Sequence, residues 1–465
     1  MPARLAIVLA SLLPAGGATA AHADVASDAL VHADATRALG YTGTGVTVAV
    51  LDTGIDDGDS AVAGAVVAEH CFVPPDGCPD GTGEEDGPGS AADDQGHGTA
   101  MADIIAGNGR AGPVGVAPGA SIVAVKVADR NGRTSTAQIV AGLTWVLQHH
   151  PETRIVNVSL GSDVMLSGDC SGLTPTFKAY AAVVDQLRAN ETTVFASSGN
   201  GGSRASMTSP ACIHDVVAVG AVYSRSFGSF TAPFVCRDDS TAVDEIACFS
   251  NSSTELDLLA AGAPVSADGL DSTDLSLAGT SAASAQAAGA AAVLIGVDPA
   301  LTSDGLVGLL ESTGAPITDA RSGFTRPRID LAAALGALIG RPVPLLPTPP
   351  DILPPMPPKL SAPTVPKASL STRPIAFGSV HPSRTVTRRL VIHNAGTGFL
   401  TVRVATSHAP ISARPSKLTV AAAGSGTFAV TFTPRRAGSY RGVLRLLTDD
   451  PSAPTITVAV RGSAR

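Results

Sequence analysis

Three residues of the 465-residue sequence could together cleave an acyl bond: an aspartate, a histidine and a serine. Asp52 ends an apolar run, His97 lies between two glycines, and Ser281 opens an Ala-rich helical stretch. A serine hydroxyl is a weak nucleophile unless a base takes its proton, and that base needs a third group to fix its tautomer. The residue types therefore predict that Ser281 attacks a carbonyl, His97 moves the proton and Asp52 orients the histidine.

Taken singly, each of the three motifs has a more common structural role. An aspartate after a strand usually forms a turn or caps a helix, and a lone histidine usually lies on the surface. A serine at a helix start is by default an N-cap. Their occurrence together, in the order Asp, His, Ser, is what favours catalysis. A serine at a helix N-terminus also places its own N–H where a developing oxyanion can be met.

The elements that must position these residues alternate between strands and helices from about residue 44 to residue 339. Strands that are apolar on both faces and separated by helices predict a parallel sheet covered on both sides, an α/β fold. Active groups gather at the carboxyl ends of such strands, which is where Asp52 lies. The run from Ser281 to Val297 is interrupted by Ser284, Gln286 and Gly289, which favours a buried central helix over a membrane span. The expected strands are 46–51, 122–127, 155–160, 193–196 and 216–219, with helices over 136–148 and 179–187.

Five segments of the sequence resemble motifs of the subtilases. They follow one another in the family's order over about 230 residues, and the resemblance covers roughly residues 40–340. It implies a subtilisin-like fold and a triad of Asp52, His97 and Ser281. It also implies an oxyanion hole made by the Asn200 side chain and the Ser281 N–H. The segments are Val48-Ala49-Val50-Leu51-Asp52-Thr53-Gly54-Ile55-Asp56, Gly96-His97-Gly98-Thr99, Val156-Asn157-Val158-Ser159-Leu160-Gly161, Ser197-Ser198-Gly199-Asn200 and Gly279-Thr280-Ser281.

The resemblance further implies a substrate groove and a primary specificity pocket, lined by Ser159, Leu160, Gly161, Ser197, Ser198 and Gly199. No metal is expected in catalysis. Subtilases often hold structural calcium, but no ligand set in this sequence matches residue by residue. Asp93 and Asp94, just before His97, could bind a cation or simply face solvent, and we favour the solvated interpretation. The chain departs from the family after the nucleophile, where Ala282, Ala285 and Gln286 replace the usual methionine, proline and histidine. This departure puts catalytic efficiency in doubt.

The N-terminus has the three features of a secretory signal in order. Arg4 supplies the positive charge, Leu5 to Leu13 form a short apolar stretch, and residues 18–20 or 21–23 offer a small-residue cleavage site. The apolar stretch is too short to span a bilayer as a mature helix. The sequence therefore predicts a signal peptide over residues 1–23 and a secreted or extracytoplasmic protein with no transmembrane segment after cleavage.

The six cysteines of the chain fit an exported protein, because their number is even and none has a CxxC spacing. Six cysteines allow 15 pairings. Short loops close most easily, so we expect sequential pairing. The expected disulfides are Cys71–Cys78, Cys170–Cys212 and Cys236–Cys248.

The C-terminal part changes character after a linker over residues 341–367, which holds eleven prolines. Residues 368–465 show short strand-like runs with turn residues between them, which predicts a β-sandwich. Four segments there resemble immunoglobulin-like modules of the ASH and major-sperm-protein type. The four segments are Phe377-Gly378, Asn394-Ala395-Gly396, Phe432-Thr433-Pro434 and Asp449-Asp450-Pro451.

The peptidase domain is expected over residues 24–340, before the linker.

The net charge of −9 is unevenly distributed along the chain. Residues 1–367 carry a balance of −20, and residues 368–465 carry +11 from 13 basic and two acidic residues. Arginine-rich surfaces bind anionic polymers. We therefore expect the C-terminal domain to tether the chain to anionic cell-envelope polymer, with no nucleic-acid partner. The alternative is that this domain docks on its own acidic peptidase domain.

The sequence as a whole predicts a secreted serine endopeptidase that hydrolyses proteins or peptides through an acyl-enzyme intermediate. The rival hypothesis is a surface binding or structural protein built on a catalytically impaired protease fold. The altered residues after Ser281 and the appended β-domain favour the rival slightly. The presence of all three triad residues and of Asn200 argues against it.

Overall fold

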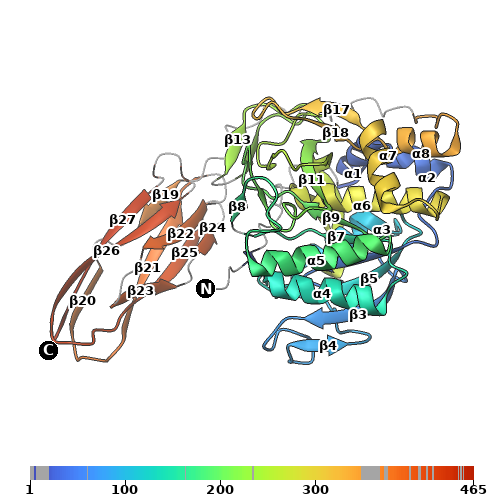
Figure 1. The fold of residues 1–465 in the computed structure, drawn as a ribbon. Helices are drawn as coiled ribbons and strands as arrows, with labels where there is room; N and C mark the ends of the chain where they lie inside the picture. The colour runs from blue at the N-terminus through green and yellow to red at the C-terminus, as the bar shows by residue number, and fades with distance from the viewer. Residues whose placement is uncertain are drawn as a thin grey trace. The chain divides into compact units, whose positions relative to one another are not determined.

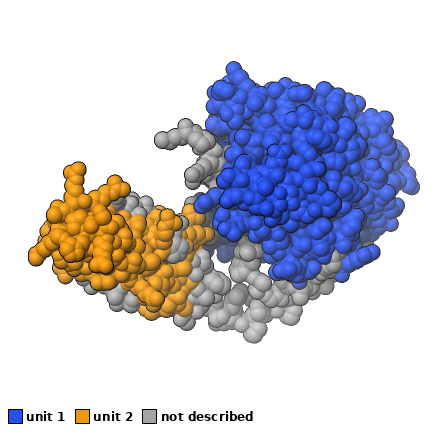
Figure 2. Space-filling view, turned by 90° about the horizontal axis from the view of Figure 1, so that it is seen from below, with its two compact units in different colours: residues 1–350 blue, residues 351–465 orange. Residues whose placement is uncertain are grey.

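The computed structural model divides into two compact units, residues 1–350 and 351–465, which Figure 2 colours separately. The division falls within the proline-rich segment expected to be a linker, most of which lies outside the described residues, as does most of the expected signal peptide. The structure describes residues 5–6, 20–59, 61–110, 112–162, 164–232, 235–346, 367–370, 375–396, 400–406, 410–414, 417–420, 424–448, 450, 453 and 455–465.

The first unit is built on a ten-stranded, mostly parallel sheet (Figure 1). The order across it is β17 (Ala315–Thr318), β18 (Thr325–Arg328), β14 (Leu258–Ala263), β11 (Val216–Tyr223), β9 (Thr193–Ser197), β7 (Ile155–Val158), β2 (Thr47–Asp52), β5 (Ser121–Lys126), β3 (Val66–Phe72) and β4 (Glu84–Asp86). The edge strands β17 and β4 are antiparallel, and the strands between them run parallel. The central strands are buried along nearly their whole length, which confirms the expected α/β fold.

Helices cover both faces of this sheet. The helices are α1 (Ala20–Val31), α2 (Ala33–Ala38), α3 (His97–Ala106), α4 (Thr136–His149), α5 (Pro175–Ala189), α6 (Thr280–Val297), α7 (Ser303–Thr313) and α8 (Leu331–Ile339). The α4 and α5 helices pack together on one face, and α3 packs against α6 on the other (Figure 1). Among the described residues, α6 is the one helix long and apolar enough to cross a membrane, but 89% of it is buried inside the unit. It is the central core helix expected from its interrupted apolar run.

Short strand pairs and disulfides hold the loops of the first unit. The pairs are β1 (Leu5–Ala6) with β6 (Arg133–Thr134), β8 (Met165–Leu166) with β10 (Met207–Thr208), β12 (Phe230–Ala232) with β13 (Cys236–Asp238), and β15 (Val265–Gly269) with β16 (Thr273–Leu277), the last joined by the 3₁₀ turn η1 (Leu270–Ser272). Three disulfides are present, Cys71–Cys78, Cys170–Cys212 and Cys236–Cys248, and these are the pairs expected from the sequence.

The second unit is all β and has its own apolar core, which includes the buried rings of Phe377, Phe428 and Phe432. A four-stranded sheet consists of β19 (Ala368–Leu370), β21 (Val386–Asn394), β25 (Ser425–Phe432) and β23 (Ile411–Arg414). A five-stranded sheet consists of β20 (Ile375–Val380), β27 (Thr455–Ala464), β26 (Gly438–Thr448), β22 (Leu400–Thr406) and β24 (Lys417–Val420). The strand-like runs of the sequence at residues 386–392, 418–420, 427–432, 443–447 and 455–460 correspond to β21, β24, β25, β26 and β27.

Candidate active site

The structure brings Asp52 and His97 into direct contact. Asp52 is the last residue of β2, and His97 is the first residue of α3. The Nδ1 atom of His97 lies 2.7 Å from Oδ1 of Asp52, and the two side chains are 3% and 0% exposed. Because an ionised carboxylate only accepts hydrogen bonds, this contact places the proton of a neutral imidazole on Nδ1 and leaves Nε2 as a base.

Glycines on either side of His97 allow this close approach. Gly96 precedes the helix with φ +98°, a conformation that side chains other than glycine rarely adopt. A Cβ atom added to Gly98 would lie only 2.0 Å from the carbonyl oxygen of Gly54 and 3.0 Å from Cβ of Asp52. Any larger residue at position 98 would push the start of α3 away from the end of β2.

The carboxylate of Asp93 fixes the start of α3 from the other side. Its Oδ1 accepts a hydrogen bond from the N–H of Gly96, at 3.0 Å, and its Oδ2 accepts from the N–H and the hydroxyl of Thr99, at 3.1 and 2.7 Å. An aspartate just before a helix that accepts from first-turn N–H groups is a cap. The simple expectation that Asp93 and its neighbour Asp94 face solvent is therefore wrong for Asp93.

Lys126 is a second positioning residue that the sequence did not reveal. It ends β5, is paired in register with Asp52, and is 1% exposed. Its ammonium group donates to the carbonyl oxygen of Thr53 and lies 2.6 Å from Oδ1 of Asp94. The buried cation thus ties the residue after Asp52 to the segment before His97. A lysine that ends an otherwise apolar strand was the signal available in the sequence.

Ser281 lies in the first turn of α6 and is 3% exposed. Its hydroxyl donates to the carbonyl oxygen of Ser159 at 3.2 Å, while the Ser159 hydroxyl donates to the Ser281 carbonyl oxygen at 3.0 Å. Asn157 bridges the Ser159 hydroxyl, at 2.9 Å, and the hydroxyl of Ser284, at 2.7 Å. This buried network locks the start of α6 to the carboxyl end of β7, and Ser284 is a member that the sequence did not reveal.

The structure does not join Ser281 to His97 by a hydrogen bond. Among the described residues, Nε2 of His97 is buried and has no hydrogen-bond partner. Proton transfer from Ser281 to His97 therefore requires the hydroxyl to exchange the Ser159 carbonyl for Nε2. Catalytic hydrogen bonds of this kind often form only once substrate is bound.

The side chain of Asn200 is oriented by Thr280. Its Oδ1 accepts hydrogen bonds from the N–H and from the hydroxyl of Thr280, both at 2.8 Å. Since both Thr280 groups act as donors here, the amide oxygen must face them and the NH₂ group must face the opposite way. Ser281 is the next residue, and its N–H is among the first four of α6, which have no acceptor within the helix.

The electrostatic surroundings of His97 favour its protonated form. Burial disfavours the imidazolium, but the charge of Asp52, its hydrogen bond to Nδ1 and the more distant charge of Asp93 outweigh that effect. The pKa of His97 is therefore raised above its ordinary value of 6.5. A raised pKa makes Nε2 a stronger base, which suits the role that the sequence predicts for His97, to take a proton from a hydroxyl.

The residues expected to line a substrate groove follow β7 and end β9, two adjacent strands. Ser159, Leu160, Ser197 and Ser198 are all buried. The Ser198 carbonyl oxygen already accepts a hydrogen bond from the Asn251 side chain at 2.9 Å. The structure thus brings the two segments to the same edge of the sheet as Asp52.

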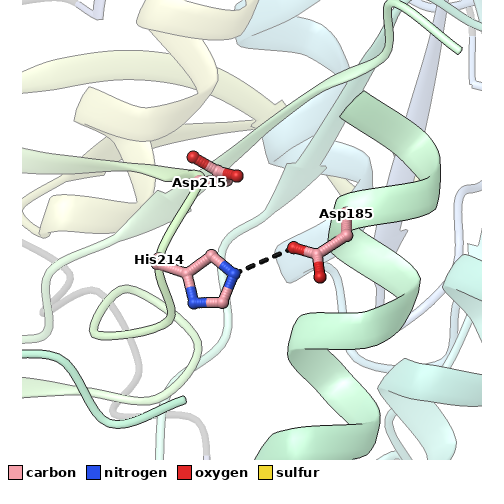
Figure 3. Close-up of side chains that lie close together, drawn as sticks. All are labelled: Asp185, His214 and Asp215. Carbon is pink, nitrogen blue, oxygen red and sulfur yellow. Dashed lines mark hydrogen bonds and ion pairs between the residues drawn. The ribbon is translucent and has the colours of Figure 1, made fainter. Parts of the chain in front are cut away.

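A separate cluster could in principle hold a metal ion. Asp185, His214 and Asp215 gather on the surface, as Figure 3 shows, and they are the one group of at least three such ligands found among the described residues. Both ring nitrogens of His214 are already engaged, at 2.7 Å by the Ser171 hydroxyl and at 2.9 Å by Asp185. The guanidinium of Arg188 lies 3.8 Å from Asp215 and competes with any cation. We therefore assign no metal site to this exposed cluster.

Comparison with known proteins identifies the class to which this fold and site belong. The model of the subtilase family matches residues 43–328, so the chain belongs to the subtilase family of serine endopeptidases. An immunoglobulin-like domain of the HYDIN/CFA65/VesB type matches residues 366–463, the all-β unit. Subtilases need no cofactor for catalysis.

Individual relatives agree with this assignment. Subtilisin DY of Bacillus licheniformis is 32% identical over 294 residues, which are 62% of this chain and 91% of that protein. The extracellular serine proteinase of Thermus sp. strain Rt41A is 31% identical over 263 residues, 56% of this chain and 53% of that protein. A solved protease from Pseudoalteromonas arctica is 24% identical, with a TM-score of 0.50 over 64% of this chain and 91% of that one, a likeness that bears on the fold.

Proposed function

We propose that the chain is a secreted endopeptidase in which Asp52, His97 and Ser281 act as a catalytic triad. The observation that carries this proposal is the buried 2.7 Å contact between Asp52 and Nδ1 of His97, which leaves Nε2 without a partner among the described residues. A histidine fixed in this way is ready to act as a general base. The first turn of α6, which supplies Ser281, is anchored by Ser159 at the neighbouring strand end.

In the proposed reaction, Nε2 of His97 takes the proton of the Ser281 hydroxyl as the oxygen attacks the peptide carbonyl carbon. The carbonyl oxygen becomes an oxyanion, which the Asn200 NH₂ group and the Ser281 N–H stabilise. Collapse of this intermediate breaks the C–N bond, and His97 gives its proton to the leaving amine. Water then repeats the sequence on the Ser281 ester, releasing the acid and restoring the hydroxyl.

Asn200→Ala tests the oxyanion hole independently of the nucleophile. We expect kcat to fall by about 10²–10³-fold, because one preorganised donor to the oxyanion is lost. KM should change much less, and labelling of Ser281 by a fluorophosphonate should remain detectable, since the nucleophile and its base are intact. The measurement is steady-state hydrolysis of a chromogenic peptide.

Thr280→Val is the variant to compare with Asn200→Ala, because it removes the hydroxyl that donates to Asn200 Oδ1 and accepts from the Gly199 N–H, while the Asn200 amide itself is kept. It should give a smaller loss of kcat than Asn200→Ala does. A kcat for Asn200→Ala that equals the wild-type value would exclude Asn200 from the oxyanion hole.

Secretion is part of the same proposal. The sequence features of residues 1–23 support an export signal, and the three disulfides support an oxidising compartment, because such bonds persist outside the cytosol. The Thermus relative is an extracellular proteinase by name. We retain the expected domain limits, residues 24–340 and 368–465, as part of this proposal.

The basic C-terminal domain is proposed to hold the enzyme on anionic cell-envelope polymer. We expect the full-length Ser281→Ala chain, which cannot digest itself, to be retained on heparin at low salt and released as the salt concentration rises. A Ser281→Ala chain that ends at residue 346 should pass through the heparin column unbound, because it lacks the net charge of +11 that residues 368–465 carry. If heparin retained both the full-length and the truncated chain, or retained neither, the proposal that the C-terminal domain is a tether would be contradicted. Flow-through of the full-length chain would instead support docking of the basic domain on the acidic peptidase domain.

A further inference from the structure

A cavity of about 630 Å³ lies at the edge of the sheet, lined by residues of β3, β4 and the end of α4. Its lining includes four carboxylates, at Asp57, Glu69, Glu84 and Asp86. It also includes three histidines, and the described lining residues include no lysine or arginine. The chemistry of this lining therefore favours a cationic occupant. None of the proposed catalytic residues lines the cavity.

His70 adds a buried imidazole nitrogen to this acidic cavity. Its ring is 4% exposed and is stacked on Trp145, with centroids 4.6 Å apart. Its Nδ1 lies 2.7 Å from Oδ1 of Asp86, which fixes the proton of the neutral ring on Nδ1. Its Nε2 is buried and has no hydrogen-bond partner among the described residues. A buried nitrogen whose lone pair has no hydrogen-bond donor raises the free energy of the folded state unless a ligand binds to that lone pair.

Glu84 is placed to share a ligand with His70. Its Oε1 lies 3.7 Å from Nε2 of His70. An ion with tetrahedral bonds of about 2.0–2.2 Å holds two of its ligand atoms about 3.4 Å apart. Because the Glu84 side chain is 68% exposed, it can close the remaining few tenths of an ångström without disturbing the core.

Two further histidines of the cavity have the same arrangement. Nδ1 of His149 lies 3.1 Å from the carbonyl oxygen of Trp145, and Nδ1 of His150 lies 3.0 Å from Oε1 of Glu152. An oxygen on Nδ1 is the usual partner of a histidine that binds metal through Nε2. His149 and His150 line the same cavity and offer two further imidazoles, and water can fill the remaining positions of a coordination shell.

We propose that this cavity binds a divalent transition-metal ion of the Zn²⁺ type, with Nε2 of His70 and Oε1 of Glu84 as the preset ligands. Asp86 acts as the positioning residue for His70. An imidazole ligand selects Zn²⁺, Ni²⁺ or Cu²⁺ over the oxygen-preferring Ca²⁺ and Mg²⁺. The bound ion would link the hairpin of β3 and β4 to the end of α4, and so stabilise the edge of the sheet.

The test is calorimetric titration of the full-length Ser281→Ala chain with ZnCl₂, with the thermal midpoint followed in parallel. We expect one ion bound at this cavity and a rise in midpoint with Zn²⁺ concentration, because the ion binds only the folded state. His70→Gln should abolish this binding, and Glu84→Gln and Asp86→Asn should each weaken it by about 10–100-fold. CaCl₂ should give no binding that depends on His70.

Two matched variants separate this site from other histidines. His97→Ala removes the catalytic imidazole, and His214→Ala removes the exposed cluster, so both should leave the cavity binding unchanged. Glu84 is exposed, so Glu84→Gln tests the site even where His70→Gln impairs folding. The proposal is overturned if no Zn²⁺ binding is detected at 1 mM. It is also overturned if Glu84→Gln binds Zn²⁺ as well as the parent chain does while His97→Ala or His214→Ala loses the binding.

Discussion

Ser281→Ala is expected to lower kcat for peptide hydrolysis by about 10⁶-fold, the loss that follows removal of the nucleophile from a triad of this type. The remaining activity would come from substrate binding and oxyanion stabilisation, which do not need the Ser281 hydroxyl. The loss should appear in kcat with little change in KM, because the missing bond forms only in the reaction. Steady-state hydrolysis of a peptide substrate measures it.

Ser312→Ala is the matched control, because Ser312 is an exposed serine of α7 whose hydroxyl donates to the carbonyl oxygen of Leu309, in its own helix, at 3.3 Å. It should leave kcat within about twofold of the wild-type value. Both variants should keep the wild-type thermal midpoint within a few degrees, since neither change opens a large cavity. A Ser281→Ala chain that hydrolyses peptides at the wild-type rate would refute the assignment of the nucleophile.

Asp52→Asn is expected to lower kcat by about 10⁴-fold, because an amide opposite Nδ1 stabilises the wrong tautomer of the histidine. The residual activity should also change its pH dependence. His97 must be neutral to accept a proton, so wild-type kcat/KM falls as the pH is lowered through the pKa of His97. That pKa is raised above 6.5, and Asp52 is the main cause of the increase.

Without the Asp52 charge, burial lowers the pKa of His97 and is opposed by the more distant charge of Asp93, the weakest of the effects that raise the pKa. The acidic limb of the kcat/KM profile should therefore move to lower pH in Asp52→Asn. Asp93→Asn should move it in the same direction by less, because Asp93 contributes the smallest of the effects that raise the pKa. An acidic limb that stays in place, or that moves to higher pH, would exclude Asp52 as the group that sets the basicity of His97.

The raised pKa of His97 also relates activity to stability. A group whose pKa is higher in the folded state stabilises the fold below its unfolded pKa, and this contribution is lost as the pH rises through the folded pKa. Activity requires the opposite condition, a neutral His97. We therefore expect the proposed site to be active in the pH range where the Asp52–His97 pair no longer contributes its charge-assisted stabilisation.

The sequence predicted which elements carry Asp52 and Ser281 because strand ends and helix starts are local features. Asp52 could be placed at the end of a strand from the apolar run before it, and Ser281 at the start of a helix from the alanines after it. Glycine on both sides of His97 indicated a close approach, which the contact between Gly98 and Gly54 explains. These properties depend on neighbours in the chain, which a single sequence contains.

The sequence could not predict the supporting contacts, because these join segments far apart in the chain. Lys126 meets Asp94 across 32 residues, and Ser281 meets Ser159 across 122. We expected Asp93 to face solvent, because its role as a cap of α3 depends on how the chain turns into that helix. In the second unit, strands such as β20 and β23 were missed because only pairing with distant strands stabilises such short runs.

Reaction with a fluorophosphonate probe tests the central proposal most directly, because the probe forms a stable bond only with a serine that a neighbouring base activates. We expect one adduct per chain, located on Ser281 by peptide mass mapping and absent from Ser281→Ala. His97→Ala should slow labelling by several orders of magnitude, since the hydroxyl then has no base. An intact, folded chain that remains unlabelled, or that is labelled at another serine, would contradict the proposal that Ser281 is the nucleophile of an active protease.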